Sequence, residues 1–399
     1  MDHLTSQLKN ALCQGFQEAF GCEPERFFSA PGRTELSGNH TDHQHGVVLA
    51  AAVDLEAVAA VRENGTDEIR IQSQGYPLCR VSLRELTPQE SEYNTTLSLI
   101  RGVAARFAEL GACLRGFDAY VQSTVLPGSG LSSSAAFEVL IGTVINSLFF
   151  ENKASAPEIA IIGQYAENVF FGKPSGLMDQ MASSVGGMVF IDFADTKKPV
   201  IRPVAFDFAA CGHALCIIDT RASHADLTDE YAAIPQEMQK ICAHFGKSFL
   251  REVDEDAFYE ALPQLRETCG DRAVLRAIHI FRENARVPLQ VQALEEGDFQ
   301  RYLQMMKESG YSSWLYLQNV IPAGEIRNQS VAVALALCDR YLKGQGGFRV
   351  HGGGFAGTVQ AFVPLAMVED FRRGIENALG AGACHVLSIR QTGGTERLP

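Results

Sequence analysis

Hydrophobic side chains recur at every fourth position near the start of the chain, at Leu4, Leu8, Leu12, Phe16 and Phe20. This spacing predicts an amphipathic helix over residues 3–20 that packs on a core. The next apolar segment is β-rich. It predicts a strand that starts at residue 27, a turn at Pro31 and Gly32, a polar loop, and an apolar strand over 47–53.

The rest of the chain mixes strand-like and helix-like segments. In chain order we predict edge strands at 68–72 and 79–83, a helix at 98–110, a strand at 119–126, helices at 135–150 and 157–171, strands at 186–193 and 214–219, a helix that opens at 226, mostly helical sequence over 271–345, and a strand that runs into three glycines at 352–354. This pattern indicates a mixed α and β protein without internal repeats.

The length and charge of the chain limit its class. With 399 residues we expect two domains, and a change of composition at 195–199 suggests residues 1–198 and 199–399. The net charge of −13 argues against nucleic acid or an anionic membrane as the main partner. No apolar run reaches the length of about 18 residues that a membrane span needs. The N-terminus lacks the pattern of a secretory signal, so we expect a cytoplasmic protein.

The ten cysteines are scattered, and none forms a C-x-x-C pair. In a chain of this length the pattern is typical of reduced, buried thiols in a cytosol. The spacing does not favour a zinc site.

The polar loop after residue 32 is denser in functional groups than a turn requires. It holds Arg33, Glu35, Asn39, His40, Asp42, His43 and His45. Carboxylates, imidazoles and amides are the groups that bind sugar hydroxyls. Two other interpretations stay open: a solvated turn, or a metal site formed by the three histidines, whose spacing lacks the i, i+4 pattern of helical zinc ligands.

A second segment, 125–140, predicts an anion-binding turn. Pro127, Gly128 and Gly130 end a strand, and Ser132 to Ser134 open an apolar helix. A helix N-terminus presents unpaired N–H groups, and a glycine-rich turn lets a phosphate approach them. The segment lacks the lysine of a Walker loop, and an ordinary strand–turn–helix corner is the alternative.

Two acidic residues stand out further along the chain. Glu167 lies in the predicted helix 157–171, and Asp179 follows the helix breakers Gly172, Pro174 and Gly176. Taken alone, Glu167 is typical of a charge on a helix surface, and Asp179 is typical of an acid at a helix N-terminus. His279 and Glu283, at i and i+4, could be a ligand pair, but we expect a solvated helix face there.

Two of these motifs carry a resemblance to a known family. The stretch from Ala30 to Gly46, APGRTELSGNHTDHQHG, resembles the galactokinase signature, whose usual form is G-R-x-N-L-I-G-E-H-T-D-Y-x-x-G. The stretch LPGSGLSSSAA at 126–136 resembles the phosphate loop of the wider GHMP kinase superfamily. The Glu167–Asp179 segment and the glycine-rich segment 345–358 resemble further blocks of that superfamily and follow in the same order.

The resemblance implies an α+β, two-domain GHMP kinase-like architecture with the active site between the domains. It also implies ATP-dependent phosphorylation of a galactose-like sugar at the anomeric hydroxyl. Asp179 is then the catalytic base and Arg33 its cationic partner. Glu167, twelve residues before Asp179 as in the family, would bind Mg²⁺ together with Ser134. The implied sugar contacts are Glu35, Asn39, His40, Asp42, Gly176 and Tyr231, and the implied nucleotide contacts are Pro127, Gly128, Ser129, Gly130, Leu131, Ser132, Ser133 and Ser134.

The chain departs from the family pattern at two neighbouring sugar positions. Asn39 stands where galactokinases carry glutamate, and Glu35 stands where they carry asparagine. We therefore expect weaker discrimination at C6 of the sugar. The aromatic residue that galactokinases place near the adenine is missing from 95–98. Three alternatives stay open: a non-catalytic galactose and ATP sensor, a kinase for a C6-modified sugar such as galacturonate, and a superfamily kinase for a non-sugar alcohol. We expect a monomer with a small-molecule sugar and ATP as its partners.

Overall fold

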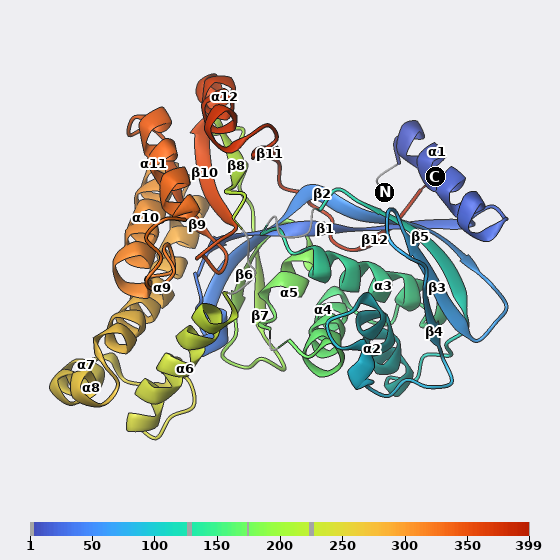
Figure 1. The fold of residues 1–399 in the computed structure, drawn as a ribbon, viewed down its shortest axis with the longest axis horizontal. Coiled ribbons are helices and arrows are strands. Elements are labelled where there is room, and N and C mark those ends of the chain that lie inside the picture. The colour runs from blue at the N-terminus through green and yellow to red at the C-terminus, as the bar shows by residue number, and fades with distance from the viewer. Residues whose placement is uncertain (1–3, 126–129, 174, 223–226, 399) are drawn as a thin grey trace.

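A computed structural model describes residues 4–125, 130–173, 175–222 and 227–398. Two sheets organise these residues, and Figure 1 shows them side by side with helices packed around each. The mixed α+β class expected from the sequence is confirmed. All ten cysteines are free thiols.

The larger sheet belongs mostly to the N-terminal half of the chain. Its strands run in the order β12-β1-β2-β5-β3-β4, with β6 paired to β2 and β7 paired to β6. The strand bounds are β1 Arg26–Ser37, β2 Val47–Glu63, β3 Glu68–Ser73, β4 Cys79–Ser82, β5 Phe117–Ser123, β6 Met188–Asp192, β7 Val200–Val204 and β12 Thr395–Arg397. The β3–β5 pair is parallel, and the other pairings described for this sheet are antiparallel.

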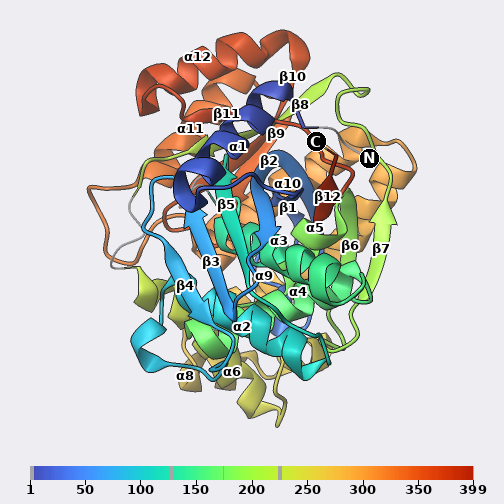
Figure 2. The same ribbon diagram turned by 90° about the vertical axis from the view of Figure 1, so that its right-hand side faces the viewer.

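Helices cover both faces of the larger sheet. Helix α1 packs on one face through Leu12 and Phe16, and α2 to α5 pack on the other, as Figures 1 and 2 show. Their bounds are α1 Ser6–Phe20, α2 Thr96–Glu109, α3 Ser133–Phe149, α4 Ala156–Tyr165 and α5 Met178–Val185. A short π-helix, η3 (Ala166–Phe171), continues α4. Helices α1 to α4 lie close to the expected ones, because their apolar spacing was regular.

The smaller sheet has the strand order β11-β8-β10-β9 and is antiparallel. Its bounds are β8 His213–Asp219, β9 Gly347–His351, β10 Thr358–Pro364 and β11 Cys384–Leu387. The helices of this half are α6 Thr228–His244, α7 Glu255–Glu260, α8 Leu262–Thr268, α9 Asp271–Glu295, α10 Phe299–Ser312, α11 Ser330–Leu342 and α12 Val368–Leu379. The largely helical character expected over 271–345 is confirmed.

The turn expected at Pro31 and Gly32 is wrong. Strand β1 runs without interruption from Arg26 to Ser37, and the pairing register with β2 shifts between Pro31 and Arg33. A proline that cannot donate to the ladder is tolerated at such a bulge. The bulge therefore keeps the chain extended and places Arg33 on a strand instead of a loop.

The expected solvated face at His279 and Glu283 is also wrong. Both side chains are fully buried on α9, which extends through Pro288 to Glu295. His279 Nε2 bonds the backbone oxygen of Asn39, and Glu283 accepts from Ser309. The helix face is polar because it packs against the polar signature segment rather than against water.

Two strands cross the division expected near residue 198. Strand β7 pairs with β6, and β12 pairs with β1, so both complete the larger sheet from beyond that position. A cut at 198 would separate them from the sheet they belong to. Within the described residues no helix is both long and apolar enough to cross a membrane.

Candidate active site

Arg33 and Asp179 form a two-pronged ion pair between β1 and α5. Arg33 Nε donates to Asp179 Oδ1 at 2.7 Å, and Nη2 donates to Oδ2 at 2.8 Å. Ser132 Oγ also donates to Oδ2, at 2.7 Å. The Asp179 side chain nevertheless keeps 30% of its surface exposed. The fold therefore brings together the expected base, its cationic partner and one residue of the phosphate loop.

The charge state of Asp179 follows from these contacts. Burial alone would raise the pKa of this carboxyl, but the Arg33 guanidinium and the Ser132 hydroxyl outweigh it and lower the pKa to about 2. Asp179 is consequently ionised at neutral pH. Arg33 stays charged for the same reason, since Asp179 and Glu35 raise its pKa against the effect of burial.

Glu167 lies on the π-helix η3 and is held on both oxygens. Ser134 Oγ is 3.3 Å from Oε1, and Lys173 Nζ is 2.9 Å from the same oxygen. Ser175 and Gln180 donate to Oε2 at 2.6 and 3.0 Å. Burial alone would lower the pKa of Lys173, but Glu167 raises it, so the amine stays charged.

The N-terminus of α3 is built to leave donors free. Ser132 occupies the N-cap with φ 57° and ψ 68°, and its side chain does not cap the helix because it donates to Asp179. Gly130 has φ 71°, and a Cβ there would lie 2.3 Å from Thr358 Oγ1, so only glycine fits. The side chain of Leu131 is buried, and its carbonyl accepts from Arg33 N–H.

Asp42 and Gly176 approach each other closely beside this site. A Cβ on Gly176 would meet Asp42 Oδ2 at 2.1 Å, so the absence of a side chain is what allows the contact. Asp42 Oδ1 accepts from His43 N–H at 2.9 Å. The second oxygen of Asp42 thus lies against the backbone of the segment that leads into Asp179.

His40 and Tyr231 hold the glycine loop 352–354 from two sides. His40 Nε2 lies 3.1 Å from the oxygen of Gly353, and Tyr231 donates to the oxygen of Gly354 at 2.8 Å. Burial, then the neighbouring His43, lower the pKa of His40 to about 3, so this imidazole is neutral. Burial raises the pKa of Tyr231 to about 12, which keeps the phenol protonated.

Glu35 and Asn39 belong to the buried part of the signature segment, on the side that contacts the second sheet. Asn39 is 0% exposed. Its amide donates to Glu35 Oε1 at 3.2 Å and to the oxygen of Gly352 at 2.6 Å, and it accepts from Asn319 at 2.9 Å. Arg349 donates to Glu35 Oε1 at 2.7 Å. A sugar could reach these two side chains only if these hydrogen bonds rearranged, so their role as sugar contacts stays a prediction.

The residues present fit a magnesium ion and a nucleotide. Mg²⁺ takes hard oxygen ligands and is commonly bound by one or two protein groups plus phosphates. Ser134 Oγ and Glu167 Oε1 supply two such oxygens, and Lys173 shows that this carboxylate already attracts a cation. Among the described residues no cluster of three His, Cys, Asp or Glu side chains could hold a metal ion by itself.

Three expected nucleotide contacts, Pro127, Gly128 and Ser129, lie outside the described residues. Lys173 was missed from the sequence. A usable signal was its place between the helix breakers Gly172 and Pro174, a few residues from two acids. The role of Gln180 could not be read from its position, because its contacts depend on how α3, α5 and η3 pack.

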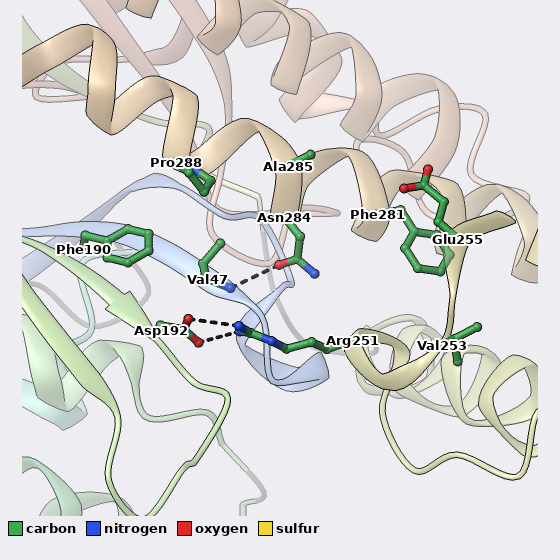
Figure 3. A pocket seen from close by; sticks show the side chains of 10 residues that line it. All are labelled: Val47, Phe190, Asp192, Arg251, Val253, Glu255, Phe281, Asn284, Ala285 and Pro288. Atoms are coloured by element: carbon green, nitrogen blue, oxygen red, sulfur yellow. Dashed lines mark hydrogen bonds and ion pairs between the residues drawn. The ribbon is translucent and has the colours of Figure 1, made fainter. Parts of the chain in front are cut away.

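A surface pocket elsewhere is not the candidate site. Figure 3 shows that it lies beside the start of β2, under α9. Arg251 is paired with Asp192 there, and Asn284 accepts from Val47 N–H. None of the expected site residues that the structure describes lines this pocket.

Comparison with known proteins agrees with the motifs. A family model of the galactokinase galactose-binding signature matches residues 14–63, and one of the GHMP kinase N-terminal domain matches residues 98–187. The galactokinase of Streptomyces coelicolor is 33% identical over 393 residues, which cover 96% of this chain and 97% of the relative.

Solved structures show the same fold. The galactokinase of Lactococcus lactis, solved in complex with galactose, has a TM-score of 0.82 at 24% identity and covers 97% of this chain and 99% of its own. A D-glycero-D-manno-heptose 1-phosphate kinase from Bacteroides thetaiotaomicron has a TM-score of 0.63 at 16% identity, with 94% and 99% covered. Together with the sequence matches, these findings show that the chain belongs to the galactokinase family of the GHMP kinase superfamily.

Proposed function

We propose that this protein transfers the terminal phosphoryl group of ATP to the anomeric C1 hydroxyl of galactose. The observation that carries the proposal is the ion pair of Arg33 and Asp179, which joins the sugar signature to Ser132 of the phosphate loop. Phosphoryl transfer depends mainly on positioning and charge stabilisation. These three residues supply positioning and charge stabilisation at the point where the two motifs meet.

In this proposal Asp179 accepts the proton of the attacking hydroxyl. A carboxyl with a pKa of about 2 is a weak base. A loose transition state tolerates this, because the attacking oxygen carries little new bonding until late in the transfer. Asp179 therefore orients the hydroxyl first and takes its proton late. Arg33 holds the carboxylate in place and offsets developing negative charge.

The donor side of the site is assigned by chemistry. MgATP supplies the transferable group, with the metal neutralising phosphate charge when it is bound. Ser134 and Glu167 would hold Mg²⁺, and the free N–H groups of the first turn of α3 would hold the phosphates. Lys173 is a further phosphate or metal neighbour through its contact with Glu167.

On the acceptor side, Asp42, Gly176, His40 and Tyr231 are the proposed sugar contacts. A neutral His40 and a protonated Tyr231 suit hydroxyl recognition, since each can donate or accept a hydrogen bond. We further propose a monomeric, cytoplasmic enzyme, in keeping with ten free cysteines.

A coupled assay over a panel of alcohols tests the function. The panel contains galactose, its 2- and 6-modified analogues, arabinose and mevalonate, each with ATP. We expect galactose to give the highest kcat/KM. Binding of galactose without turnover would favour a sensor, and preference for mevalonate or galacturonate would replace the proposed acceptor.

A further inference from the structure

A buried glutamate outside the proposed contacts touches the centre of the site through one amide. Glu138 lies on α3, one helical turn after Ser134, and is 1% exposed. Gln180, the residue after Asp179, donates from its single amide nitrogen to Glu138 Oε2 at 2.8 Å and to Glu167 Oε2 at 3.0 Å. One side chain thus links two carboxyl groups.

Two buried oxygens, one on Glu138 and one on Gln180, lack hydrogen-bond partners and cannot bond each other. Glu138 Oε1 and Gln180 Oε1 are both buried, and neither has a hydrogen-bond partner among the described residues. A carboxylate and an amide carbonyl are both acceptors, so no hydrogen bond can form between them. One proton on Glu138 changes this, because Oε1 then becomes an O–H donor, which is what the unpartnered carbonyl oxygen of Gln180 lacks.

The surroundings of Glu138 favour the neutral form. The titratable groups that act on it are Glu167 on η3, Lys173 just after η3, and Asp179 on α5. Burial, followed by the charge of Glu167, raises the pKa of Glu138 well above its usual range. Lys173 is already bonded to Glu167, and no ion pair joins Glu138 to any cation among the described residues. Gly163 of α4 lies against Glu138, since a Cβ there would lie 3.2 Å from Glu138 Oε2.

We propose that Glu138 is a neutral carboxylic acid that forms a cyclic pair with the amide of Gln180 and thereby positions Glu167. In this pair the acid O–H donates to Gln180 Oε1, and Gln180 Nε2 donates to Glu138 Oε2. The second N–H of Gln180 is then fixed in direction and points at Glu167. Glu138 is a positioning residue that acts through Gln180.

The consequence for the metal site rests on the proposed function. An outer neighbour that fixes the direction of a metal-binding carboxylate commonly changes metal affinity by about 10–100-fold when it is removed. The amide of glutamine can replace a neutral carboxylic acid in the same ring, because it also offers one donor and one acceptor. Leucine has a similar size but offers neither.

The experiment compares Glu138→Gln with Glu138→Leu. Infrared spectra at pH 7 are recorded for wild type and Glu138→Gln, and Mn²⁺ binding in the presence of a non-hydrolysable ATP analogue is titrated for all three proteins. We expect the wild type to show the C=O band of a protonated carboxylic acid that Glu138→Gln lacks. Glu138→Gln should bind Mn²⁺ with wild-type affinity, and Glu138→Leu should bind it about 10–100-fold more weakly.

Glu237→Gln is the matched control. Its carboxylate is buried too, but it is paired with Arg272 and Arg276 of α9. The same exchange there should lower Tm without removing a protonated-acid band, whereas Glu138→Gln should leave Tm unchanged.

The proposal is overturned if the infrared difference lacks the acid band, or if Glu138→Gln weakens Mn²⁺ binding as much as Glu138→Leu. Equal Mn²⁺ affinity in all three proteins would also overturn it. If Glu138→Leu does not fold, the acid band and the Mn²⁺ affinity of Glu138→Gln still decide whether the proposal holds. Absence of galactose phosphorylation in the wild type would refute the proposed function but would leave the infrared result intact.

Discussion

At the scale of single residues, Asp179 receives three hydrogen bonds, two from Arg33 and one from Ser132. A carboxylate so well satisfied is fixed in direction and carries a full charge. Its neighbours therefore set its chemistry, and a substitution that keeps its shape but removes its charge should separate catalysis from folding.

Asp179→Asn should lower kcat by about a hundredfold to ten-thousandfold while galactose binding largely survives, because the amide keeps the shape but cannot accept the proton. Turnover and equilibrium sugar binding are the two measurements. Asp118→Asn is the matched control, since Asp118 accepts a similar two-pronged contact from Arg70 away from the site. A variant that retains more than roughly a tenth of wild-type kcat would remove Asp179 from the role of base.

His40 should make the protein sensitive to acid. Its pKa is lowered from 6.5 to about 3. The unfolded chain takes up the proton first as pH falls, so the stability due to His40 is complete above pH 6.5 and is lost progressively towards pH 3. His40→Asn suits the positive φ of 63° and removes this titration.

Urea unfolding of both proteins, measured between pH 6.5 and about pH 3, tests whether His40 causes this loss of stability. The free energy of unfolding should fall less steeply with acid in His40→Asn than in wild type, and the two curves should run parallel above pH 6.5. Identical slopes below that pH would show that His40 does not carry the effect.

Glu35 and Asn39 exchange the residue types found at these two positions in the family signature, and here they are hydrogen-bonded to each other. Asn39→Glu alone would place two carboxylates side by side, so the double variant Glu35→Asn with Asn39→Glu is the cleaner test. We expect the double variant to discriminate more strongly between galactose and its C6 analogues, by about 1–3 kcal/mol in kcat/KM.

The assay uses galactose, galacturonate, 6-deoxygalactose and arabinose, with the wild type and both variants. An unchanged ratio of galactose to its C6 analogues would show that position 39 does not read C6. That result would agree with the buried place of Asn39 between the two sheets.

At the scale of elements, the first turn of α3 and the π-helix η3 meet at Ser134 and Glu167. A π-helix shifts the direction of the side chains along a helix and often marks a functional site. Here it places Glu167 in the interior with its carboxylate toward the phosphate-loop helix. The sequence predicted a helix over this stretch but not the change of helical type.

Ser134→Ala and Glu167→Gln should each raise the Mg²⁺ concentration needed for half-maximal activity, by at least about tenfold, without unfolding the protein. Each change removes one hard oxygen from the proposed metal site. Mg²⁺ titrations of activity, with Tm as a check on folding, measure the effect. Ser133→Ala is the matched control. A larger effect of Ser133→Ala than of Ser134→Ala would show that Ser133, and not Ser134, is the metal ligand.

Regular apolar spacing made most elements predictable. It placed α1 and α3 near their observed bounds. The long β1 was not predictable, because Pro31 reads as a turn until the bulge against β2 is seen. The resemblance to the galactokinase family implied that Arg33 and Asp179 are partners. The burial of Asn39 and His279 could not be foreseen, since each is buried by a segment far away in the sequence.

At the scale of the whole molecule, the two sheets are joined by a polar contact and by the chain itself. Arg349 from β9 reaches Glu35 on β1, and the C-terminal segment returns from β11 to pair with β1 as β12 (Figure 1). The proposed sugar contacts come from both halves, with Asp42 on one side and Tyr231 on the other. Under the proposed function, both halves therefore act on one sugar.

The most direct measurement is ³¹P and ¹H NMR of the products formed from ATP and galactose. We expect one new phosphate ester whose phosphorus couples to the anomeric proton, formed in step with ADP by the wild type and nearly absent with Asp179→Asn. Phosphorus coupled to any other sugar proton, or no product from a wild type that binds galactose, would contradict it.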